Sequence, residues 1–539
     1  MRVPLGVLLI RTASVLSVET RCPNLTRRCD APHCPVVPSS WSKEQTFANL
    51  LSVTSHSGAN SLGAHSGSNP IPHVVVVGAG IAGLSAAAAL KSHGFKVTVV
   101  EGSPSIGGKL ALDEIAGITV DVGAESMLNR RPEATDLARM AGLADKLVYP
   151  ATTSSNIWSR GTMHPMPRTL MGVPTDAQAL AESGVISTAG LARAALDAVL
   201  PATRIGEQDV SVGWLVEERF GKEIVDRLVE PLLGGVYAGH ARELSARAAV
   251  PQVVALLDRD KSMLNAAAAA TSAASDVPVF AGIAGGLGAL PGAVVASAGL
   301  DVRTDTTVRT LARRSGGGWK LVVGSTRDPE VVQADAVVLA TPARQSARLL
   351  GDVVPDAAME LARIEYASMA IVTLAFRRRD FPSTTGSGFL VPPIDKREIK
   401  AATYSFAKWP WVEDAGRGAN NGEDVLVMRC SIGRHREERV LQVDDAELVQ
   451  LALEDLSAAA GLSVRPIDWH VQRWGGALPQ YAVGHLDRVR RVRAAVAKSP
   501  GLAVCGAAYD GLGIPACISS ANLAVEQIFE GLAAAGPDG

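Results

Sequence analysis

One segment near the start of the chain, residues 73–101, limits the possible folds more than any other. Its β-branched run Val74–Val77 stops at Gly78, an alanine-rich stretch follows over Ile81–His93, and a second apolar run covers Lys96–Val100. A membrane-spanning helix needs about 20 continuous apolar residues, and the glycines interrupt this segment too early. The pattern therefore predicts strand, glycine turn, helix and strand, with the strands buried on both faces of a parallel sheet.

The glycines of this turn follow the spacing Gly-x-Gly-x-x-Gly at Gly78, Gly80 and Gly83. The first glycine permits a tight turn, the second allows the backbone to approach a pyrophosphate, and the third lets the helix pack closely on the sheet. The amino end of the helix then faces the phosphate charge. Glu101 follows the second strand and is placed to accept hydrogen bonds from ribose hydroxyls. Together these features predict a dinucleotide site.

Two more glycine-rich segments accompany the first turn. The sequence SIGGKL at Ser105–Leu110 indicates backbone wrapped closely around a ligand, and VDVGAES follows at Val120–Ser126. Near the other end of the chain, residues 506–515 (GAAYDGLGIP) form a glycine-rich turn before a helix. The free N–H groups and the positive dipole end of that helix suit an anionic partner. Both ends of the chain are therefore expected to contribute to one site.

The pattern also predicts elements between these segments. An amphipathic helix is expected over Val212–Val229, and a helix end that runs into a loop is expected over Asn265–Asp276. Strands of a meander that returns to the first domain are expected at Val302–Leu311, Trp319–Val323 and Val331–Ala340. Further expected elements are strands at Tyr366–Phe376 and Val425–Ile432, a helix over Asp444–Ala460, and a final strand, glycine turn and helix.

The first glycine turn, SIGGKL and VDVGAES together resemble the flavin amine oxidase and protoporphyrinogen oxidase superfamily, in which this extended fingerprint marks bound FAD. Within it, the chain resembles the oxygen-dependent coproporphyrinogen and protoporphyrinogen oxidases over residues 73–531. The segments that carry this likeness are Gly123–Ala134, Val229–Ser245, Phe280–Pro291, Ala334–Ala343 and Val471–His485. Ile157–Pro174 is most similar to the Gram-positive, actinobacterial-type branch, and residues 1–70 match no segment of the family.

The resemblance implies an α/β fold with a Rossmann-like FAD-binding domain assembled from both chain ends, an α+β substrate-binding domain and a helical insertion. FAD-binding segments are expected at 71–150, 276–345 and 486–539. A helical insertion with part of the substrate region is expected at 151–275, and the substrate-binding domain at 346–485. Residues 1–70 include a stretch rich in Ser, Gly, Asn and His without apolar periodicity, so a disordered extension is expected there.

The resemblance also implies which residues hold FAD. Trp474 matches a family position beside the flavin, and Val308 matches the position that contacts adenine through its backbone. The expected cofactor-binding residues are Gly78, Ala79, Gly80, Ile81, Ala82, Gly83, Glu101, Gly102, Gly108, Lys109, Gly123, Ala124, Glu125, Ser126, Val308, Trp474, Gly506, Leu512, Gly513 and Ile514.

A tetrapyrrole that carries carboxylates requires cations at the rim of its pocket and aromatic or apolar walls. Arg130 and Arg131 follow GAES directly and are candidates for contacts with propionate groups, with a solvated surface pair as the alternative. Tyr366, Gln480 and Tyr481 are candidates to line the substrate pocket, and core packing is the alternative for Tyr366. The family implies no single general base, so no catalytic residue is assigned.

The activity implied by the resemblance is FAD-dependent oxidation of coproporphyrinogen III to coproporphyrin III in haem synthesis, with molecular oxygen as acceptor and hydrogen peroxide as product. Oxidation of protoporphyrinogen IX is the nearest alternative, because motif spacing does not reveal whether four or two carboxylates are bound. An amine oxidase, a carotenoid desaturase and an inactive flavin-binding module are more distant alternatives. The expected partnership is a transient transfer of product to the next haem-pathway enzyme.

Composition excludes other classes of function. The chain has 52 basic against 54 acidic residues, which gives no electrostatic basis for binding nucleic acid. Its six cysteines lack the paired spacing of a zinc site and are too few for a disulfide scaffold, so we expect no metal site and a cytoplasmic location. No segment is long and apolar enough to span a bilayer. Peripheral membrane contact through the helical region near residues 160–260 stays open.

Overall fold

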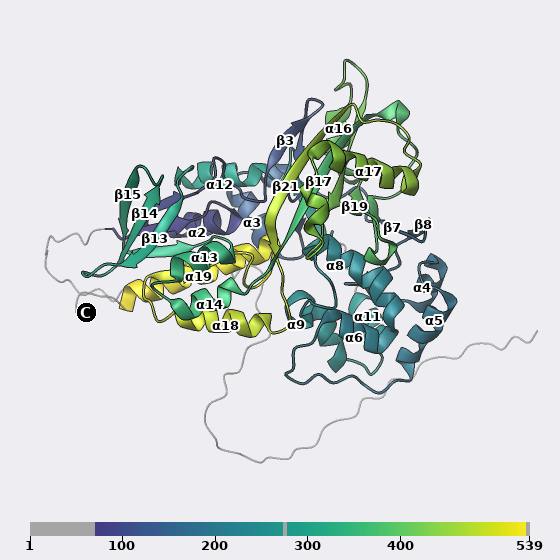
Figure 1. The fold of residues 1–539 in the computed structure, drawn as a ribbon, viewed down its shortest axis with the longest axis horizontal. Helices are drawn as coiled ribbons and strands as arrows, with labels where there is room; N and C mark the ends of the chain where they lie inside the picture. Colours follow the sequence, from purple (N-terminus) through teal and green to yellow (C-terminus); the bar gives the residue numbers. More distant parts are fainter. Residues whose placement is uncertain (1–70, 273–276, 535–539) are drawn as a thin grey trace, which may run out of the picture. The chain divides into compact units, whose positions relative to one another are not determined.

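The computed structural model describes residues 71–272 and 277–534, so the expectations for residues 1–70 and for the loop at 273–276 lie outside the described residues. Figure 1 shows the fold. A five-stranded parallel sheet has the order β12–β2–β1–β16–β22. Its strands are β1 (His73–Val77), β2 (Lys96–Val100), β12 (Asp301–Arg303), β16 (Ala336–Leu339) and β22 (Leu502–Val504). Both ends of the described chain therefore meet in one sheet.

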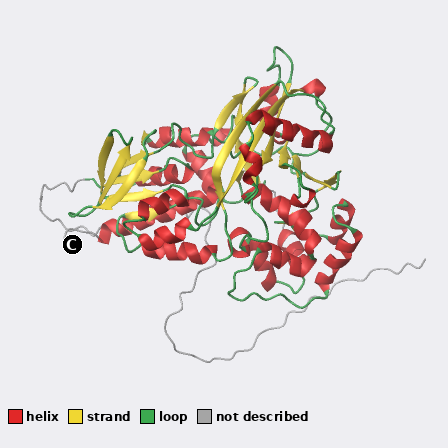
Figure 2. Cartoon of the chain, in the orientation of Figure 1, coloured by secondary structure: helices red, strands yellow, loops and turns green. Residues whose placement is uncertain are grey.

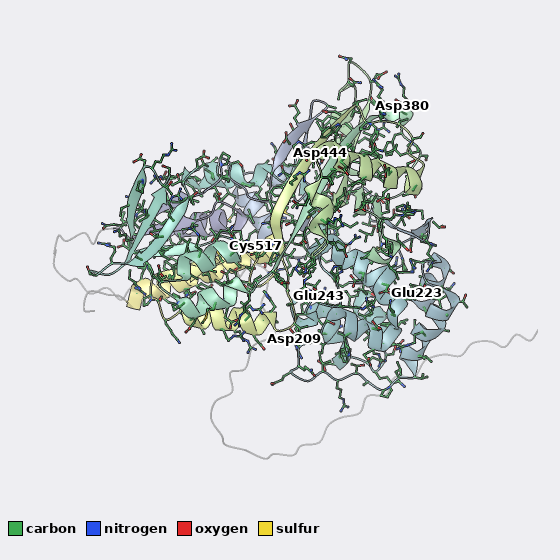
Figure 3. The ribbon with its side chains drawn as sticks, in the orientation of Figure 1. Asp209, Glu223, Glu243, Asp380, Asp444 and Cys517 are labelled. Atoms are coloured by element: carbon green, nitrogen blue, oxygen red, sulfur yellow. The ribbon has the colours of Figure 1, made fainter. Side chains whose placement is uncertain are left out.

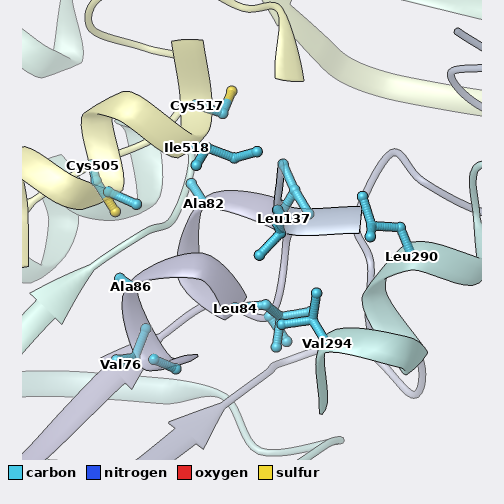
Figure 4. Packing of buried hydrophobic residues seen from close by; sticks show 14 of the residues in the cluster. Val76, Ala82, Leu84, Ala86, Leu137, Leu290, Val294, Cys505, Cys517 and Ile518 are labelled. Atoms are coloured by element: carbon cyan, nitrogen blue, oxygen red, sulfur yellow. The ribbon is translucent and has the colours of Figure 1, made fainter. Parts of the chain in front are cut away.

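The side chains of β1 alternate between two cores. Val74 and Val76 pack in a core with α2 (Ile81–Ser92) and α19 (Ile514–Ala534), as Figure 4 shows around Val76. Val75 and Val77 pack in the second core. The first core also contains α3 (Pro132–Met140) and α12 (Ala289–Ala298). The second contains α13 (Ala343–Leu350), α14 (Pro355–Ala362), α18 (His485–Val496) and the antiparallel meander β13 (Val308–Arg313), β14 (Trp319–Gly324) and β15 (Pro329–Ala334). Burial on both faces explains the unbroken apolar run of β1.

A second, seven-stranded sheet has the order β21–β17–β20–β19–β18–β7–β8. Figure 1 labels several of its strands, and Figure 2 colours the strands yellow. Its strands are β21 (Asp468–Pro479), β17 (Tyr366–Arg377), β20 (Val425–Ile432), β19 (Ile399–Thr403), β18 (Gly388–Leu390), β7 (Asn156–Ser159) and β8 (Thr162–Pro165). Leu448 and Leu456 of α17 (Asp445–Ala460) lie in one core with Val372 of β17. A different core joins β17 and β20 to the hairpin β3 (Leu112–Ile115) and β4 (Ile118–Asp121) and to α16 (Pro410–Gly416), which follows the short α15 (Ser405–Lys408).

The segment between β8 and β11 is mainly helical. Its helices are α4 (Ala177–Ser183), α5 (Thr188–Ala195), α6 (Val212–Phe220), α7 (Lys222–Ile224), α8 (Glu230–Tyr237), α9 (Ala246–Ala249), α10 (Pro251–Val254) and α11 (Met263–Ser272). Arg219 and Asp197 form a buried ion pair at 2.6 Å, and Asp197 also accepts a hydrogen bond from Ser262. This pair connects α6 to the start of α11. Short strands complete the fold: β5 (Met127–Leu128), β6 (Leu147–Val148), β9 (Thr169–Leu170), β10 (Val173–Pro174) and β11 (Phe280–Ile283).

The expected strands at 74–77, 96–100, 366–376 and 425–432 and the expected helices at 81–93 and 444–460 are confirmed. The continuous helix over Val212–Val229 is wrong, because α6 ends at Phe220, Gly221 has φ +85° and a π-helical turn occupies Val225–Val229. The expected meander is wrong in which strands it contains. The expected strand at Val302–Leu311 joins β12 to β13, and the one at Val331–Ala340 joins β15 to β16. Strands β12 and β16 belong to the parallel sheet, and the meander consists of β13, β14 and β15. Burial explains this division, because β16 is buried throughout whereas β15 is mostly exposed.

The expected mixed α/β fold class is confirmed, whereas the domain boundaries at residues 150, 275, 345 and 485 stay a prediction. Within residues 71–272 and 277–534, no helix combines the length and apolar character needed to cross a membrane. The same residues contain no group of three or more His, Cys, Asp or Glu side chains arranged to hold a metal ion.

Candidate functional site

A cavity of about 450 Å³ lies at the carboxyl ends of strands β1, β2 and β16. Ligands of open α/β sheets bind at this edge, because the loops and helix amino ends gather there. Twelve of the expected cofactor residues line the cavity: Gly78, Gly80, Ile81, Ala82, Glu101, Gly102, Gly108, Lys109, Ala124, Val308, Gly506 and Ile514. The other eight, Ala79, Gly83, Gly123, Glu125, Ser126, Trp474, Leu512 and Gly513, are not among its lining residues.

The three glycines of the first turn have different structural roles. Gly78 has φ +106°, a conformation that favours glycine. A Cβ atom on Gly83 would lie 1.9 Å from the carbonyl oxygen of Gly78, so Gly83 serves the packing of α2 on the turn. A Cβ atom on Gly80 would meet no protein atom within 4 Å, and Gly80 lines the cavity at the uncapped amino end of α2. The space beside Gly80 therefore suits a ligand phosphate.

The Glu101 carboxylate lies at the rim of the same cavity. It accepts hydrogen bonds from the backbone N–H of Ala79 at 2.7 Å and from the N–H and hydroxyl of Ser103 at 2.9 Å. These bonds fix the carboxylate at the end of β2, where a ribose is expected. Ala79 thus contributes through its backbone although it does not line the cavity.

The second glycine-rich segment closes over the first turn. The N–H of Gly107 donates to the carbonyl oxygen of Ala79 at 2.8 Å, and Gly108 has φ +60°. Lys109 lines the cavity, and burial lowers the pKa of its amine. A Cβ atom on Gly123 would lie 2.0 Å from the carbonyl oxygen of Lys109. The close approach of the two segments therefore requires glycine at position 123. Lys109 is therefore a basic side chain at the cavity wall without an ion pair among the described residues.

Glu125 lies next to the cavity but faces a cluster of ions. Its carboxylate lies 2.6 Å from the amine of Lys408 and 3.5 Å from the guanidinium of Arg429, and we call these three residues the Glu125 cluster. Burial alone would raise the pKa of Glu125, but Lys408 and Arg429 hold it at about 2. Ser126, the next residue, is half-buried. Glu125 thus has the role of a structural anion in this structure, and Ala124 is the residue of GAES that lines the cavity.

The C-terminal glycine turn reaches the cavity through its two ends. Gly506 has φ +119° and its N–H donates to Ser520 at 3.2 Å. Ile514 begins α19 and, with Cys517, lines the cavity near the amino end of this helix (Figure 3). Leu512 and Gly513 lie in the turn between them, outside the lining. Cys505 is fully buried in the core beside α2, as expected for a packing residue.

Two further expected cofactor residues, Val308 and Trp474, come from distant parts of the sequence. Val308 lines the cavity, and its carbonyl oxygen accepts a hydrogen bond from Arg348 at 2.7 Å. Trp474 donates from its indole N–H to the carbonyl oxygen of Val122 at 3.1 Å. The sequence did not predict five polar lining residues: Thr306, Thr307, Thr341, Gln345 and Arg348. The spacing of Gln345 and Arg348 on a helix directly after a buried strand was the available signal for two of them.

The substrate candidates separate into two groups. Tyr366 lines the cavity, accepts a hydrogen bond from the N–H of Ala343 at 2.8 Å, and burial raises its pKa to about 12. Gln480 and Tyr481 are buried and are not among its lining residues. Gln480 donates to the carbonyl oxygen of Tyr237, and the Tyr481 hydroxyl donates to the carbonyl oxygen of Ala507 at 2.5 Å. The structure therefore gives these two residues protein partners.

The two arginine candidates differ in whether they have partners within the protein. Arg131 forms an ion pair with Glu133 and donates to Ser519 of α19 at 2.9 Å. Arg130 is exposed and forms no ion pair or hydrogen bond with the described residues. Neither arginine lines the cavity. Of the two, Arg130 has the guanidinium that is free to meet a ligand carboxylate.

The parallel sheet and the cavity at its edge define a protein of the dinucleotide-binding class. The chain belongs to the flavin-containing amine oxidoreductase family, whose match covers residues 81–529. It is similar to the coproporphyrinogen III oxidase of Mycobacterium tuberculosis, with 36% identity over 85% of this chain and 97% of the relative. The corresponding Bacillus subtilis protein is 31% identical over 84% of this chain and 97% of its own length.

A solved structure supports the same family assignment. The crystal structure of a protein from Exiguobacterium is 31% identical in sequence, covers 85% of this chain and 98% of its own, and has a TM-score of 0.75. The predicted resemblance to the oxygen-dependent porphyrinogen oxidases is confirmed, including its actinobacterial members.

Proposed function

We propose that this chain binds FAD and oxidises coproporphyrinogen III to coproporphyrin III with molecular oxygen. The observation that carries this proposal is the sequence similarity: the chain covers 97% of a relative named coproporphyrinogen III oxidase at 36% identity. The cavity supports it, because Gly80, Glu101 and the amino ends of α2 and α19 converge on a single space. These groups match what a dinucleotide requires from a protein.

The residues present fit FAD in three places. Glu101 is held by two backbone N–H groups in position for ribose hydroxyls. The amino end of α2 and Lys109 supply positive charge for a pyrophosphate. The amino end of α19, at Ile514, supplies backbone N–H groups for the ring system. When bound, FAD supplies two-electron oxidation of the substrate and transfer of those electrons to oxygen.

The overall reaction removes six hydrogen atoms from the porphyrinogen in three rounds, and three molecules of oxygen become three of hydrogen peroxide. The chain's contribution is to bind and orient the substrate and to exclude bulk water. Tyr366 provides an aromatic wall, and burial raises the pKa of its phenol to about 12. Arg130 is the proposed partner of a substrate propionate, because it has no ion pair among the described residues.

A cytoplasmic location belongs to the same proposal. Cys430, Cys505 and Cys517 are buried free thiols among the described residues, as suits a reducing compartment. Transfer of the product to the next haem-pathway enzyme and peripheral contact with a membrane are further parts of the proposal. A pull-down of the purified protein on vesicles, with and without product, tests the membrane contact.

The decisive experiment supplies the purified protein with coproporphyrinogen III and protoporphyrinogen IX separately. Oxygen uptake and porphyrin fluorescence are followed for each substrate, and the released cofactor is identified by chromatography after acid extraction. We expect FAD and faster oxidation of coproporphyrinogen III. Faster oxidation of protoporphyrinogen IX would overturn the substrate assignment, and a protein without flavin would overturn the cofactor assignment.

A further inference from the structure

A second cavity, of about 430 Å³, lies where β19 begins and β20 ends, next to the 3-10 turn at Glu438–Gln442. Figure 1 labels β19. None of its lining residues lines the cofactor cavity. Three of them are arginines, Arg397, Arg434 and Arg439, and we call this cavity the arginine pocket. The proposed oxidation does not use it.

Arg434 is the buried cation of this pocket. Its side chain is 6% exposed, and one guanidinium nitrogen donates to the carbonyl oxygen of Val391 at 3.1 Å. Its Nε is buried without a hydrogen-bond partner among the described residues. The contact with Glu437 is 4.0 Å long, beyond hydrogen-bond distance. A guanidinium has five N–H donors, so Arg434 retains unused donors in a cavity wall.

A second buried cation, Lys400, lies behind this wall. It is 1% exposed, and its amine donates to the carbonyl oxygen of Gly433, a lining residue, at 2.9 Å. Lys400 forms no ion pair with a described residue. Burial, reinforced by Arg434, lowers the pKa of Lys400 to about 7. Two buried cations without a closely paired anion are unfavourable, so an anion in the pocket would stabilise both charged forms.

The rim of the pocket restricts which anion fits. Glu398 and Glu437 line it beside the arginines and would repel several negative charges placed close together, as in the phosphates of a nucleotide. Val440 and Val443 also line it and give a ligand an apolar surface. Among the arginines, Arg397 already lies 3.7 Å from Asp455. The best match is one carboxylate joined to an apolar body.

We propose that the arginine pocket binds an organic carboxylate, with its carboxylate on the unused donors of Arg434 and its apolar part against Val440 and Val443. The proposal is independent of the proposed oxidation. Two sources share this chemistry: a propionate side chain of a tetrapyrrole and a small free carboxylic acid. A monocarboxylate with a short apolar body matches the cavity volume and the mixed charge of the rim.

The test uses the flavin-loaded full-length protein and 4-bromobenzoate as the probe. Titration calorimetry measures its affinity for the wild type, for Arg434→Met and for the control Arg436→Met. Arg436 lies two residues away, has a 60% exposed side chain and pairs with Glu243 and Glu365 outside the pocket. We expect at least about tenfold weaker binding to Arg434→Met and unchanged binding to Arg436→Met, because a charge-assisted hydrogen bond is lost only in the first.

Crystals of the wild type soaked with 4-bromobenzoate provide a second measurement that does not depend on the folding of a variant. An anomalous bromine signal in the arginine pocket supports the proposal, and a wild type without binding or bromine signal there overturns it. Equal weakening in both variants overturns it as well. Coproporphyrin III is then added as a competitor: displacement of the probe supports a tetrapyrrole source, and retention of the probe supports a small free acid.

Discussion

The cofactor cavity and the neighbouring Glu125 cluster are built from different parts of the chain. The cavity is shaped by backbone: Gly78, Gly80 and Gly83 leave room that any side chain would fill or distort. The cluster, one residue after Ala124 of the cavity lining, is held by side-chain charge from Lys408 and Arg429. Added atoms are therefore expected to damage the first region, and removed charge the second.

Glu125→Gln is expected to have the largest effect on stability. Lys408 and Arg429 are 17% and 12% exposed, so the variant leaves two mostly buried cations without their anion. Loss of one partner of a buried ion pair costs about 3–5 kcal/mol. Urea denaturation of the flavin-loaded protein measures the free energy of unfolding. The control is Glu413→Gln, which breaks an ion pair with Arg378 whose side chains are 40% and 43% exposed and should cost at most about 1 kcal/mol.

The same substitution should change how stability depends on pH. The pKa of Glu125 is lowered to about 2 in the folded protein, so the unfolded state binds more protons between about pH 2 and 4.5. Its contribution to stability is therefore present above this window and is lost as the pH falls through it. Unfolding measured across this window should show a smaller acid-dependent loss in Glu125→Gln than in the wild type. Parallel pH profiles would contradict the role of Glu125 as a charged partner.

Gly83→Ala tests the backbone-built region. Alanine normally favours a helix over glycine, but a Cβ atom here would lie 1.9 Å from the carbonyl oxygen of Gly78. The turn and α2 must separate, which is expected to cost about 1–3 kcal/mol and to reduce flavin retention. Urea denaturation and the flavin-to-protein absorbance ratio measure the two effects. A variant as stable as the wild type would show that the turn adapts.

Gly80→Ala separates ligand space from packing. A Cβ atom on Gly80 meets no protein atom within 4 Å, and φ of −72° suits alanine, so the flavin-free protein should be as stable as the wild type. The added methyl group enters the space expected for the pyrophosphate, and FAD affinity should fall at least about tenfold. Fluorescence titration of the flavin-free protein with FAD measures this. Unchanged affinity would place the phosphates elsewhere.

The sequence predicted the backbone-built region better than the charge-built one. Val74–Val77, the three glycines and Glu101 are close in sequence, and each has a conformational or packing reason that local pattern reveals. Glu125 was predicted as a cofactor residue from the resemblance of GAES to the family, and that role stays a prediction. Nothing near it in the sequence indicates its ion pair with Lys408, which lies 283 residues away. The arginine pocket has a similar origin, since Arg397 comes from the segment before β19 whereas Arg434 and Arg439 come from the segment after β20.

The meander shows a similar limit for the fold. Residues 331–340 are apolar enough to suggest one strand, yet the chain changes sheets at Asp335, whose carboxylate accepts a hydrogen bond from the N–H of His73 at 2.7 Å. The break therefore depends on a partner that lies 262 residues away. Local pattern predicts strands well where both faces are buried, as in β1. It does not predict which sheet a strand joins.

Tyr481→Phe is expected to have the smallest effect and to distinguish the cavity from its surroundings. The Tyr481 hydroxyl donates to the carbonyl oxygen of Ala507, and Ala507 lines the cofactor cavity. Loss of this bond should cost about 1 kcal/mol and shift the visible absorbance of the bound flavin. The control is Tyr237→Phe: this hydroxyl donates to the carbonyl oxygen of Ala249, which does not line the cavity. Comparable loss of stability in both variants, with a spectral shift only in Tyr481→Phe, would assign Tyr481 to positioning the C-terminal turn. An unshifted spectrum in both would leave it only a packing role.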